Sequence, residues 1–362
     1  MDRRVGRFTV VDALRGVAAT GVVVYHVVSA GHVKSLLEIF PVWVETVLST
    51  GGLGVAVFFV LSGFVIAHSL YDKPMSFPEF GRFTLRRSLR LDPAYWGSIA
   101  VTIAFAALSS YLVAGKQMPN LTVPQIVSHL FYLQDLLGYP AISTVYWTLC
   151  LEIQFYLVYA LLMSMSGFRT LLVVAACIIS LFWPLGFGPD VWPGLFLPLW
   201  YGFLLGVMAY WAWRQPKLAP FFGAYAGVIL LAGVLWGNAF GVVCSAAALG
   251  IFGAAVSGRI GSGLNWRWLQ FLGLISYSLY LTHNLVIGAV FRVAAMAGAR
   301  SPLEALIWWV VSLLGCVAFA AIFWLLIERP SMELSKRLGQ RKAPDLPSQT
   351  VAPLIEQGRA GI

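Results

Sequence analysis

Long apolar stretches recur along this chain and restrict what it can fold into. A helix that crosses the hydrocarbon core of a bilayer needs about 20 predominantly apolar residues. Ten segments of this kind are present, at residues 10–30, 47–70, 94–114, 145–166, 169–187, 194–213, 219–237, 239–257, 268–292 and 304–327. Because a chain in lipid must satisfy its backbone hydrogen bonds internally, we expect an all-α, polytopic membrane helix bundle with about ten transmembrane helices.

The composition excludes an ordinary soluble domain. Hydrophobic residues make up 59% of the 362 residues and charged residues only 11%, whereas soluble domains carry about 25% charged residues. The net charge of +9 would favour nucleic acid as the partner of a soluble protein, but in a membrane protein basic residues mark topology, so we expect membrane lipid and no nucleic acid as a partner. The four cysteines lie in apolar runs without a CxxC pair, so neither a disulfide nor a metal site is expected.

The distribution of basic residues predicts the orientation, because Lys and Arg accumulate in cytoplasmic loops. If the N-terminus is cytoplasmic, 19 of the 24 Lys and Arg residues lie on the cytoplasmic side, four lie outside and Arg15 lies within the first segment. We therefore predict that both termini are cytoplasmic and that the protein is a multi-pass protein of the bacterial inner membrane.

Three other stretches complete the predicted organisation. Residues 123–137 are too short to span and are predicted to form an interfacial or re-entrant piece of an outer loop. Residues 1–338 form the transmembrane domain, and the polar, Pro-containing residues 339–362 are predicted to be a disordered cytoplasmic tail. A signal-peptide core at residues 17–28 is the less favoured alternative for the first segment, since the apolar stretch begins before it.

Several ionisable residues lie within the predicted spans, and because a charge inside the membrane is costly, such residues are candidates for function. Arg15 and His26 are on the first segment, eleven residues apart, whereas Glu152 and His283 are on the fourth and ninth segments. At about 1.5 Å per residue, His26, Glu152 and His283 are predicted at similar depth, so that three helices can line one polar chamber. An imidazole is the usual general base, which makes His26 the candidate for catalysis.

Each of these residues also has a structural interpretation. His283 can be a hydrogen-bonding partner within the bundle, and Glu152 can be a buried carboxylate that ties helices together. Asp12 and Arg15 stand at positions i and i+3, a spacing that favours a local salt bridge.

The predicted inner loop GRFTLRRSLRLDPAYW carries a cluster of arginines. Arg86 and Arg90 are at i and i+4 and share a helical face, with Arg87 beside them. Anchoring of the cytoplasmic side explains any single arginine. Three together favour a polyphosphate site, since guanidinium groups bind phosphate in a bidentate manner.

The second segment, GGLGVAVFFVLSGFVIAH at residues 51–68, is rich in glycine. Close helix packing is the expected role of most of these glycines. The Ser62-Gly63 step is also predicted to leave room for a long, thin ligand.

Taken together, the motifs resemble acyltransferase family 3, whose integral membrane members O-acylate bacterial surface and exported carbohydrates. The resemblance runs from Asp12 to about Pro330 and rests on six stretches in the family's order: DALRGVAATGVVVYH with its Arg-x10-His spacing, GVAVFFVLSGF, RRSLRLDPAYW, VYWTLCLEIQFY, SYSLYLTH and IERP. Many relatives have a proline soon after the late histidine, where this chain reads HNLV at 283–286, so the role of His283 stays open.

The resemblance implies an acyl-CoA co-substrate, usually acetyl-CoA, that enters from the cytoplasm, with no permanently bound cofactor. It implies that His26 is the catalytic histidine. It also implies that Arg15 and the cluster of Arg86, Arg87 and Arg90 serve the donor or the integrity of the site.

A mechanism follows as an expectation. The donor's arm would pass Ser62 and reach His26, which takes the proton from a carbohydrate hydroxyl. Glu152 would orient the imidazole. Trp147, Tyr280 and His283 would contact the substrates, with Trp147 or Tyr280 donating a hydrogen bond to the oxyanion; a covalent acyl-His intermediate is the alternative.

The acceptor is expected to be a polysaccharide or its lipid-linked repeat unit, and the acyl group to be acetyl, with succinyl as the alternative. The rival function is a transporter or flippase for a lipid-linked glycan or an acyl group, because intramembrane polar residues also mark transport paths. A catalytically inactive assembly subunit is the third possibility.

Overall fold

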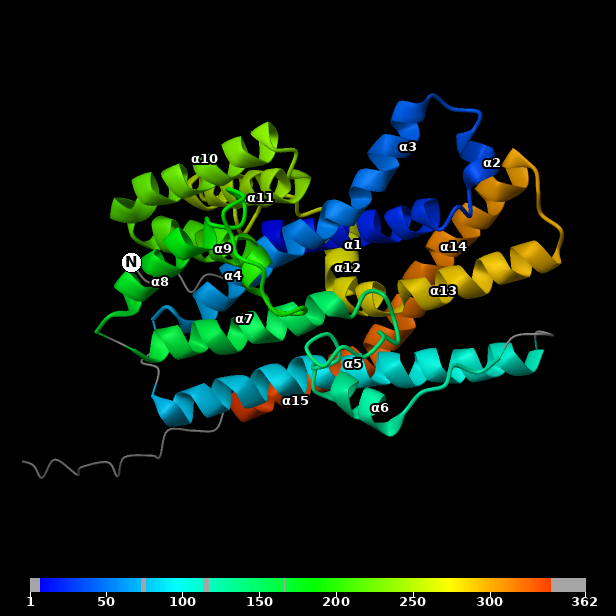
Figure 1. Ribbon diagram of the computed structural model, residues 1–362, viewed down its shortest axis with the longest axis horizontal. Helices are drawn as coiled ribbons and strands as arrows, with labels where there is room; N and C mark the ends of the chain where they lie inside the picture. The colour runs from blue at the N-terminus through cyan, green and yellow to red at the C-terminus, as the bar shows by residue number, and fades with distance from the viewer. Residues whose placement is uncertain (1–6, 73–75, 113–116, 166, 340–362) are drawn as a thin grey trace, which may run out of the picture.

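All ten apolar segments are largely helical in the computed structural model, which describes residues 7–72, 76–112, 117–165 and 167–339 (Figure 1). Within these residues, eight helices or continuous helical stretches are long and apolar enough to cross a membrane. Their helical elements are α1 (Thr9–Ser29), α3 (Val42–Ser49) continuing through η1 (Thr50–Leu53) into α4 (Gly54–Leu70), α5 (Phe77–Leu112), α7 (Trp147–Ser164), α10 (Ala219–Leu235), α11 (Ala239–Val256), α13 (Ser276–Met296), and α14 (Pro302–Phe323) continuing through the π-helical turn η4 (Trp324–Glu328) into α15 (Arg329–Gly339). The protein is therefore a polytopic helical membrane bundle.

Two of the ten predicted spans are shorter helices. The segment at 169–187 contains α8 (Arg169–Ser180), and the segment at 194–213 contains η2 (Leu197–Leu199) and α9 (Trp200–Arg214). Helix α9 has 15 residues and is buried from Trp200 to Ala212. Its uniformly apolar sequence thus reflects a central position among other helices and not contact with lipid.

The predicted single span at 268–292 is wrong, because the chain breaks at Ile275 into α12 (Arg267–Leu274) and α13. A Cβ atom on Gly273 would overlap the backbone of Asp12, and one on Gly16 would overlap the backbone of Gly273. These two glycines therefore bring α12 against α1, which α12 crosses before α13 runs in a new direction (Figure 1).

Residues 123–137 form only one short helix, α6 (Val123–Leu130), in agreement with a segment too short to span. His129 is fully buried: its Nδ1 donates to the carbonyl of Gln125 at 2.8 Å, and its Nε2 accepts from the backbone N–H of Ile142 at 3.0 Å. Burial lowers the pKa of His129, which holds the loop together as a neutral ring. The remaining short elements are α2 (Lys34–Leu37) and η3 (Pro216–Leu218). Residues 340–362 of the predicted tail lie outside the described residues.

Glycines bring α4 into backbone contact with α9. A Cβ atom on Gly63 would overlap the carbonyl of Phe203, and one on Gly206 would overlap the carbonyl of Val60. Overfilling such a contact costs about 1–3 kcal/mol. Within the predicted Ser62-Gly63 step, Gly63 packs against α9, whereas Ser62 lines a cavity on another side of α4, and its contact with a ligand stays a prediction.

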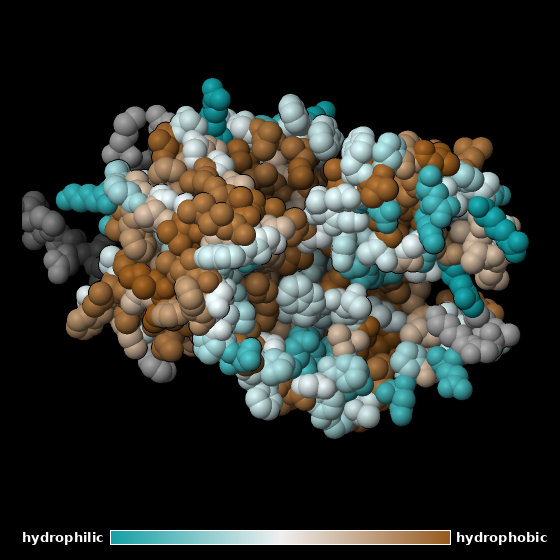
Figure 2. Space-filling view, turned by 45° about the horizontal axis from the view of Figure 1, so that its top comes forward, coloured by the Kyte–Doolittle hydropathy of each residue, from teal (hydrophilic) through white to brown (hydrophobic). Residues whose placement is uncertain are grey.

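The surface fits a bundle in lipid. Figure 2 shows hydrophobic residues over much of the left half of one face and hydrophilic ones gathered toward the right-hand end. Large apolar side chains are exposed on several outer helices, among them Leu171 of α8, Leu231 of α10 and Leu314 of α14, each at least 59% exposed. A bilayer would cover such side chains.

Candidate functional site

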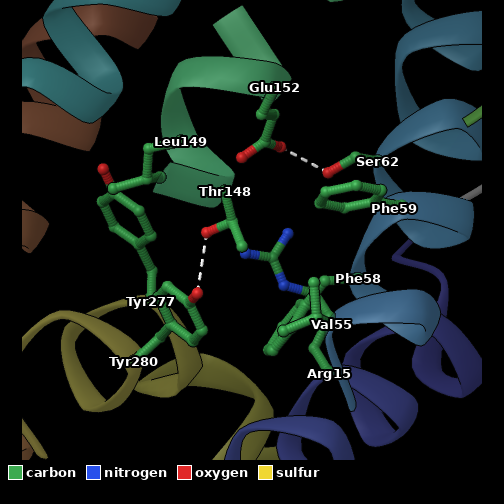
Figure 3. Close-up of a pocket in the computed structure, with 10 residues that line it drawn as sticks. All are labelled: Arg15, Val55, Phe58, Phe59, Ser62, Thr148, Leu149, Glu152, Tyr277 and Tyr280. Carbon is green, nitrogen blue, oxygen red and sulfur yellow. Dashed lines mark hydrogen bonds between the residues drawn. The ribbon is translucent and has the colours of Figure 1, made fainter. Parts of the chain in front are cut away.

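A small cavity of about 40 Å³ lies where α1, α4, α7 and α13 meet (Figure 3). It is lined by Arg15, Val55, Phe58, Phe59, Ser62, Thr148, Leu149, Glu152, Tyr277 and Tyr280. We call it the inner cavity. Figure 3 shows the guanidinium of Arg15 projecting from α1 into its centre, between side chains of α4, α7 and α13.

Arg15 has no carboxylate partner within 4 Å among the described residues. Asp12 pairs with Arg7 instead, so the predicted Asp12–Arg15 salt bridge does not form. The Nε of Arg15 donates to the hydroxyl of Ser276 at 3.3 Å. Its charge is thus left to face the cavity, where an anionic or strongly dipolar group of a ligand would stabilise it.

Glu152 is held at the opposite wall by two hydroxyl groups. The hydroxyls of Ser62 and Tyr156 both donate to its Oε1 (Figure 3 draws the bond from Ser62). This network ties α4 to α7. The expectation that Glu152 orients the imidazole of His26 is not met, because Glu152 makes its hydrogen bonds in the inner cavity and not to His26.

Two of the three predicted arginines, on the N-terminal part of α5, interact with residues around the inner cavity without lining it. The guanidinium of Arg87 stacks on the ring of Tyr156, 3.9 Å from its centroid. Arg90 interacts electrostatically with Arg87 and Arg15. The described contact of Arg86 is made by its carbonyl, which accepts from Ser335 of α15. Arg87 and Arg90 are therefore the members of the cluster with described interactions around Arg15, and donor binding by Arg86, Arg87 and Arg90 stays a prediction.

A second and larger cavity, of about 460 Å³, adjoins the inner cavity along α1, and we call it the outer cavity. It is lined by Val22, Tyr25, His26, Ser49, Gly52, Leu53, Val55, Thr144, Val145, Trp147 and Tyr280. Val55 and Tyr280 line both cavities, so these two side chains form the common wall.

The hydroxyl of Tyr280 already has protein partners at this wall. It donates to the carbonyl of Val145 at 3.0 Å and lies 2.7 Å from the hydroxyl of Thr148. Of the two predicted oxyanion donors, Trp147 is therefore the better candidate for donating to a bound substrate. It lines the outer cavity and is 38% exposed.

The structure brings His26 and His283 together. The Nε2 of His283 lies 3.3 Å from the Nδ1 of His26, and the ring centroids are 4.9 Å apart. His283 is fully buried, whereas His26 is half-buried and borders the outer cavity. The only predicted catalytic imidazole thus has a second imidazole as its neighbour.

Comparison with known proteins decides the class of reaction. Residues 8–327 match the family described as "Acyltransferase domain". The chain belongs to acyltransferase family 3. It is therefore an enzyme that transfers acyl groups.

Three relatives of this acyltransferase are informative. It is 28% identical to Nodulation protein 10 of Rhizobium leguminosarum bv. viciae, over 91% of this chain and 95% of that protein. It is 26% identical to the Exopolysaccharide production protein ExoZ of Rhizobium meliloti, over 77% of this chain and 89% of that protein. It is 27% identical to Putative acetyltransferase ORF330 of Acidianus two-tailed virus, over 47% of this chain and 45% of that protein. No solved structure matches the chain.

Sequence reasoning assigned no role to one buried acid of this acyltransferase. Glu328 is 7% exposed and lies on the π-helical turn η4. Its Oε2 accepts from the hydroxyl and the backbone N–H of Ser278, at 2.5 and 3.2 Å, and it interacts electrostatically with Arg15 and Arg90. Glu328 is the acid of the IERP motif, so its place in that motif was the sequence feature that could have indicated a role. Turns of π-helix also occur frequently at functional sites.

The described residues contain no group of three or more His, Cys, Asp and Glu side chains arranged to hold a metal ion. The four cysteines are buried and free. The ionisable groups that line the two cavities, apart from tyrosines, are the guanidinium of Arg15, the carboxylate of Glu152 and the imidazole of His26, which are groups that bind anions and move protons.

Proposed function

We propose that this acyltransferase moves an acetyl group from acetyl-CoA to a hydroxyl of an exported or surface carbohydrate in a bacterial cytoplasmic membrane. One observation supports this above the others: two cavities that share a wall lie along α1, one lined by Arg15 and the other by His26. The printed name of ExoZ, an exopolysaccharide production protein, supports a polysaccharide or its lipid-linked repeat unit as acceptor.

The donor would occupy the inner cavity. Its phosphates would bind Arg87 and Arg90, with Arg86 close by on the same helix, because guanidinium groups pair well with phosphate. Its pantetheine arm would pass Arg15 and Ser62. The rise from Arg15 to His26 is about 16 Å along α1, and an extended arm of roughly 15–20 Å, judged from chain dimensions, covers that distance.

The reaction would take place in the outer cavity. The acceptor hydroxyl gives its proton to Nε2 of His26 while its oxygen forms a bond to the thioester carbon. The C–S bond then breaks, the ester leaves with the carbohydrate, and the thiolate takes the proton back from His26 to become the free thiol of CoA. Trp147 would donate to the oxyanion, and proximity of the two substrates would supply much of the rate.

The charge distribution predicts which side each substrate uses. From the basic loops we infer that both termini and the arginine cluster lie in the cytoplasm, where acetyl-CoA is made. In Figure 1 α5, whose N-terminal part carries the cluster, begins at the left-hand end, and α1 runs away from that end toward α2 and α3. The acceptor would therefore reach His26 from the opposite side.

The test uses the full-length protein in phospholipid vesicles, acetyl-CoA labelled in its acetyl group, and polysaccharide from cells that lack this protein. We expect label on the polysaccharide and one free thiol released for each label transferred. Label that never becomes attached to polysaccharide would overturn the proposal, and label that crosses the vesicle membrane unattached would favour a carrier.

A further inference from the structure

We propose that His283 is a positioning residue that fixes the tautomer of His26. The inference rests on the proposed function, in which His26 is the general base, and it specifies which of its two nitrogens is the base. It follows from the hydrogen-bond partners of the two rings, because a backbone carbonyl can only accept a hydrogen bond.

His283 has one defined tautomer. Its Nδ1 lies 2.8 Å from the carbonyl of Tyr280 and 3.1 Å from that of Leu279. Two acceptors at this nitrogen require it to carry a proton. In a neutral ring the other nitrogen, Nε2, is then an acceptor, and full burial in an apolar bundle favours the neutral ring.

The tautomer of His26 follows from two acceptors, one of which is Nε2 of His283. The Nδ1 of His26 lies 2.9 Å from the carbonyl of Val22 and 3.3 Å from Nε2 of His283. Both neighbours are acceptors, so Nδ1 of His26 carries the proton and shares it between them. Its Nε2 is therefore unprotonated.

The unprotonated Nε2 is the nitrogen that is free to act. Among the described residues no hydrogen bond reaches Nε2 of His26, and the ring borders the outer cavity. The acceptor hydroxyl therefore finds a lone pair. Without His283, one of the two acceptors that fix the proton on Nδ1 is lost, and rings with the proton on Nε2 cannot take another from the acceptor hydroxyl.

A neutral ring suits this position better than a carboxylate. In the serine proteases a buried aspartate holds the corresponding tautomer, but a buried carboxylate needs further partners to offset its desolvation. Here the Nδ1–H of His26 keeps its bond to Nε2 of His283 when Nε2 of His26 takes the proton. That bond becomes charge-assisted and stronger at this step. The proton later leaves for the thiolate, and His283 gains none.

Two substitutions of His283 distinguish the loss of its hydrogen-bond acceptor from the loss of side-chain volume. In His283→Gln the terminal amide reaches the position of Nε2 and can present its oxygen to His26. In His283→Asn the shorter amide reaches only the position of Nδ1, so the acceptor is lost while a polar group remains. Thr282→Val is the matched control, since Thr282 is the buried neighbour on α13 and donates to the carbonyl of Ser278.

The measurement is the vesicle assay with labelled acetyl-CoA and the same polysaccharide, with kcat and the KM for acetyl-CoA determined separately. Because general-base catalysis contributes about 10²–10⁴-fold, we expect His283→Asn to lower kcat by about 10²-fold with KM nearly unchanged. We expect His283→Gln to recover at least a tenth of the wild-type kcat, and Thr282→Val to resemble the wild type.

Equal kcat values for the Gln and Asn variants would overturn the inference, and so would a change in KM alone. If both variants lose folded protein in a thermal-melt assay, kcat per folded molecule is compared, so that the ranking of Gln above Asn still decides. Failure of the wild-type protein to label the polysaccharide would instead reject the proposed function.

Discussion

The inner and outer cavities differ in charge although they share a wall. The inner cavity and its surroundings contain Arg15, Glu152, Arg87, Arg90 and Glu328. The outer cavity is lined by apolar, aromatic and hydroxyl side chains and by one imidazole. The first is suited to holding a charged molecule, and the second to moving a proton.

Coulomb's law gives a reason for this separation. Two unit charges 4 Å apart interact by about 4 kcal/mol at an effective dielectric constant near 20. An arginine at that distance from His26 would oppose the positive charge that the ring acquires with the proton. Helix α1 instead keeps Arg15 about 16 Å from His26 along its axis, so one molecule can bind phosphates and abstract a proton without conflict.

Removal of the outer imidazole should have the largest effect. We expect His26→Ala to lower acetyl transfer by about 10³-fold or more, since the general base is lost, while binding of acetyl-CoA to the inner cavity persists. His32→Ala is the matched control, because His32 follows α1 and stacks on Phe291 outside both cavities, 4.2 Å between centroids. Transfer by His26→Ala at the wild-type rate would remove the functional distinction between the cavities.

The residues that stand out against an apolar background were the ones that sequence could find. Arg15 and His26 are conspicuous within one predicted span, and both border cavities in the structure. The helical nature of the ten segments was equally predictable. Their exact extent was not, because α9 is short and wholly surrounded by protein, and hydrophobicity alone does not distinguish lipid from a protein interior.

The inner cavity should respond to loss of charge through donor binding. Arg87→Ala or Arg90→Ala should each raise the KM for acetyl-CoA by about 10–100-fold, because a hydrogen bond to a charged group contributes about 1.5–3 kcal/mol. The value of kcat should change little. Arg86→Ala serves as the comparison and should raise KM less, since the structure places Arg87 and Arg90, and not Arg86, in the cluster around Arg15.

An equal rise in KM for all three arginine variants would mean that the net charge of the loop, and not the site, attracts the donor. No change in any of them would leave the arginines only a topological role. Isothermal titration of free CoA into the purified protein measures the same contrast without turnover.

The sequence did not predict which side chains pair with each other. The i, i+3 spacing predicted that Asp12 pairs with Arg15, yet Asp12 pairs with Arg7. Glu152 was placed at the depth of His26, yet hydroxyls of its own helix and of α4 hold it in the inner cavity. Spacing along one helix gives depth and face, but the rotation of neighbouring helices decides which groups meet.

Glu328 offers a test of charge balance in the inner cavity. Glu328→Gln removes a negative charge that interacts with Arg15 and Arg90, so the unliganded protein should lose about 1–3 kcal/mol of stability. CoA phosphates would replace that charge. We therefore expect a larger rise in Tm on addition of CoA for this variant than for the wild type, and an equal rise would contradict the counter-charge role. Glu333→Gln, which removes an exposed pairing with Arg329, is the control.

The smallest effect on turnover is expected at the wall between the cavities. The size of this effect shows whether the hydroxyl of Tyr280 takes part in the reaction or only supports the structure. Its hydroxyl is already bonded to Val145 and Thr148, so Tyr280→Phe should cost about 0.5–1.5 kcal/mol of stability and lower kcat less than fivefold. Loss of an oxyanion donor costs about 10²–10³-fold in kcat. Trp147→Phe should therefore have the larger effect on turnover. If the order of the two variants is reversed, the Tyr280 hydroxyl must leave its partners during the reaction, and the wall itself becomes part of the outer site.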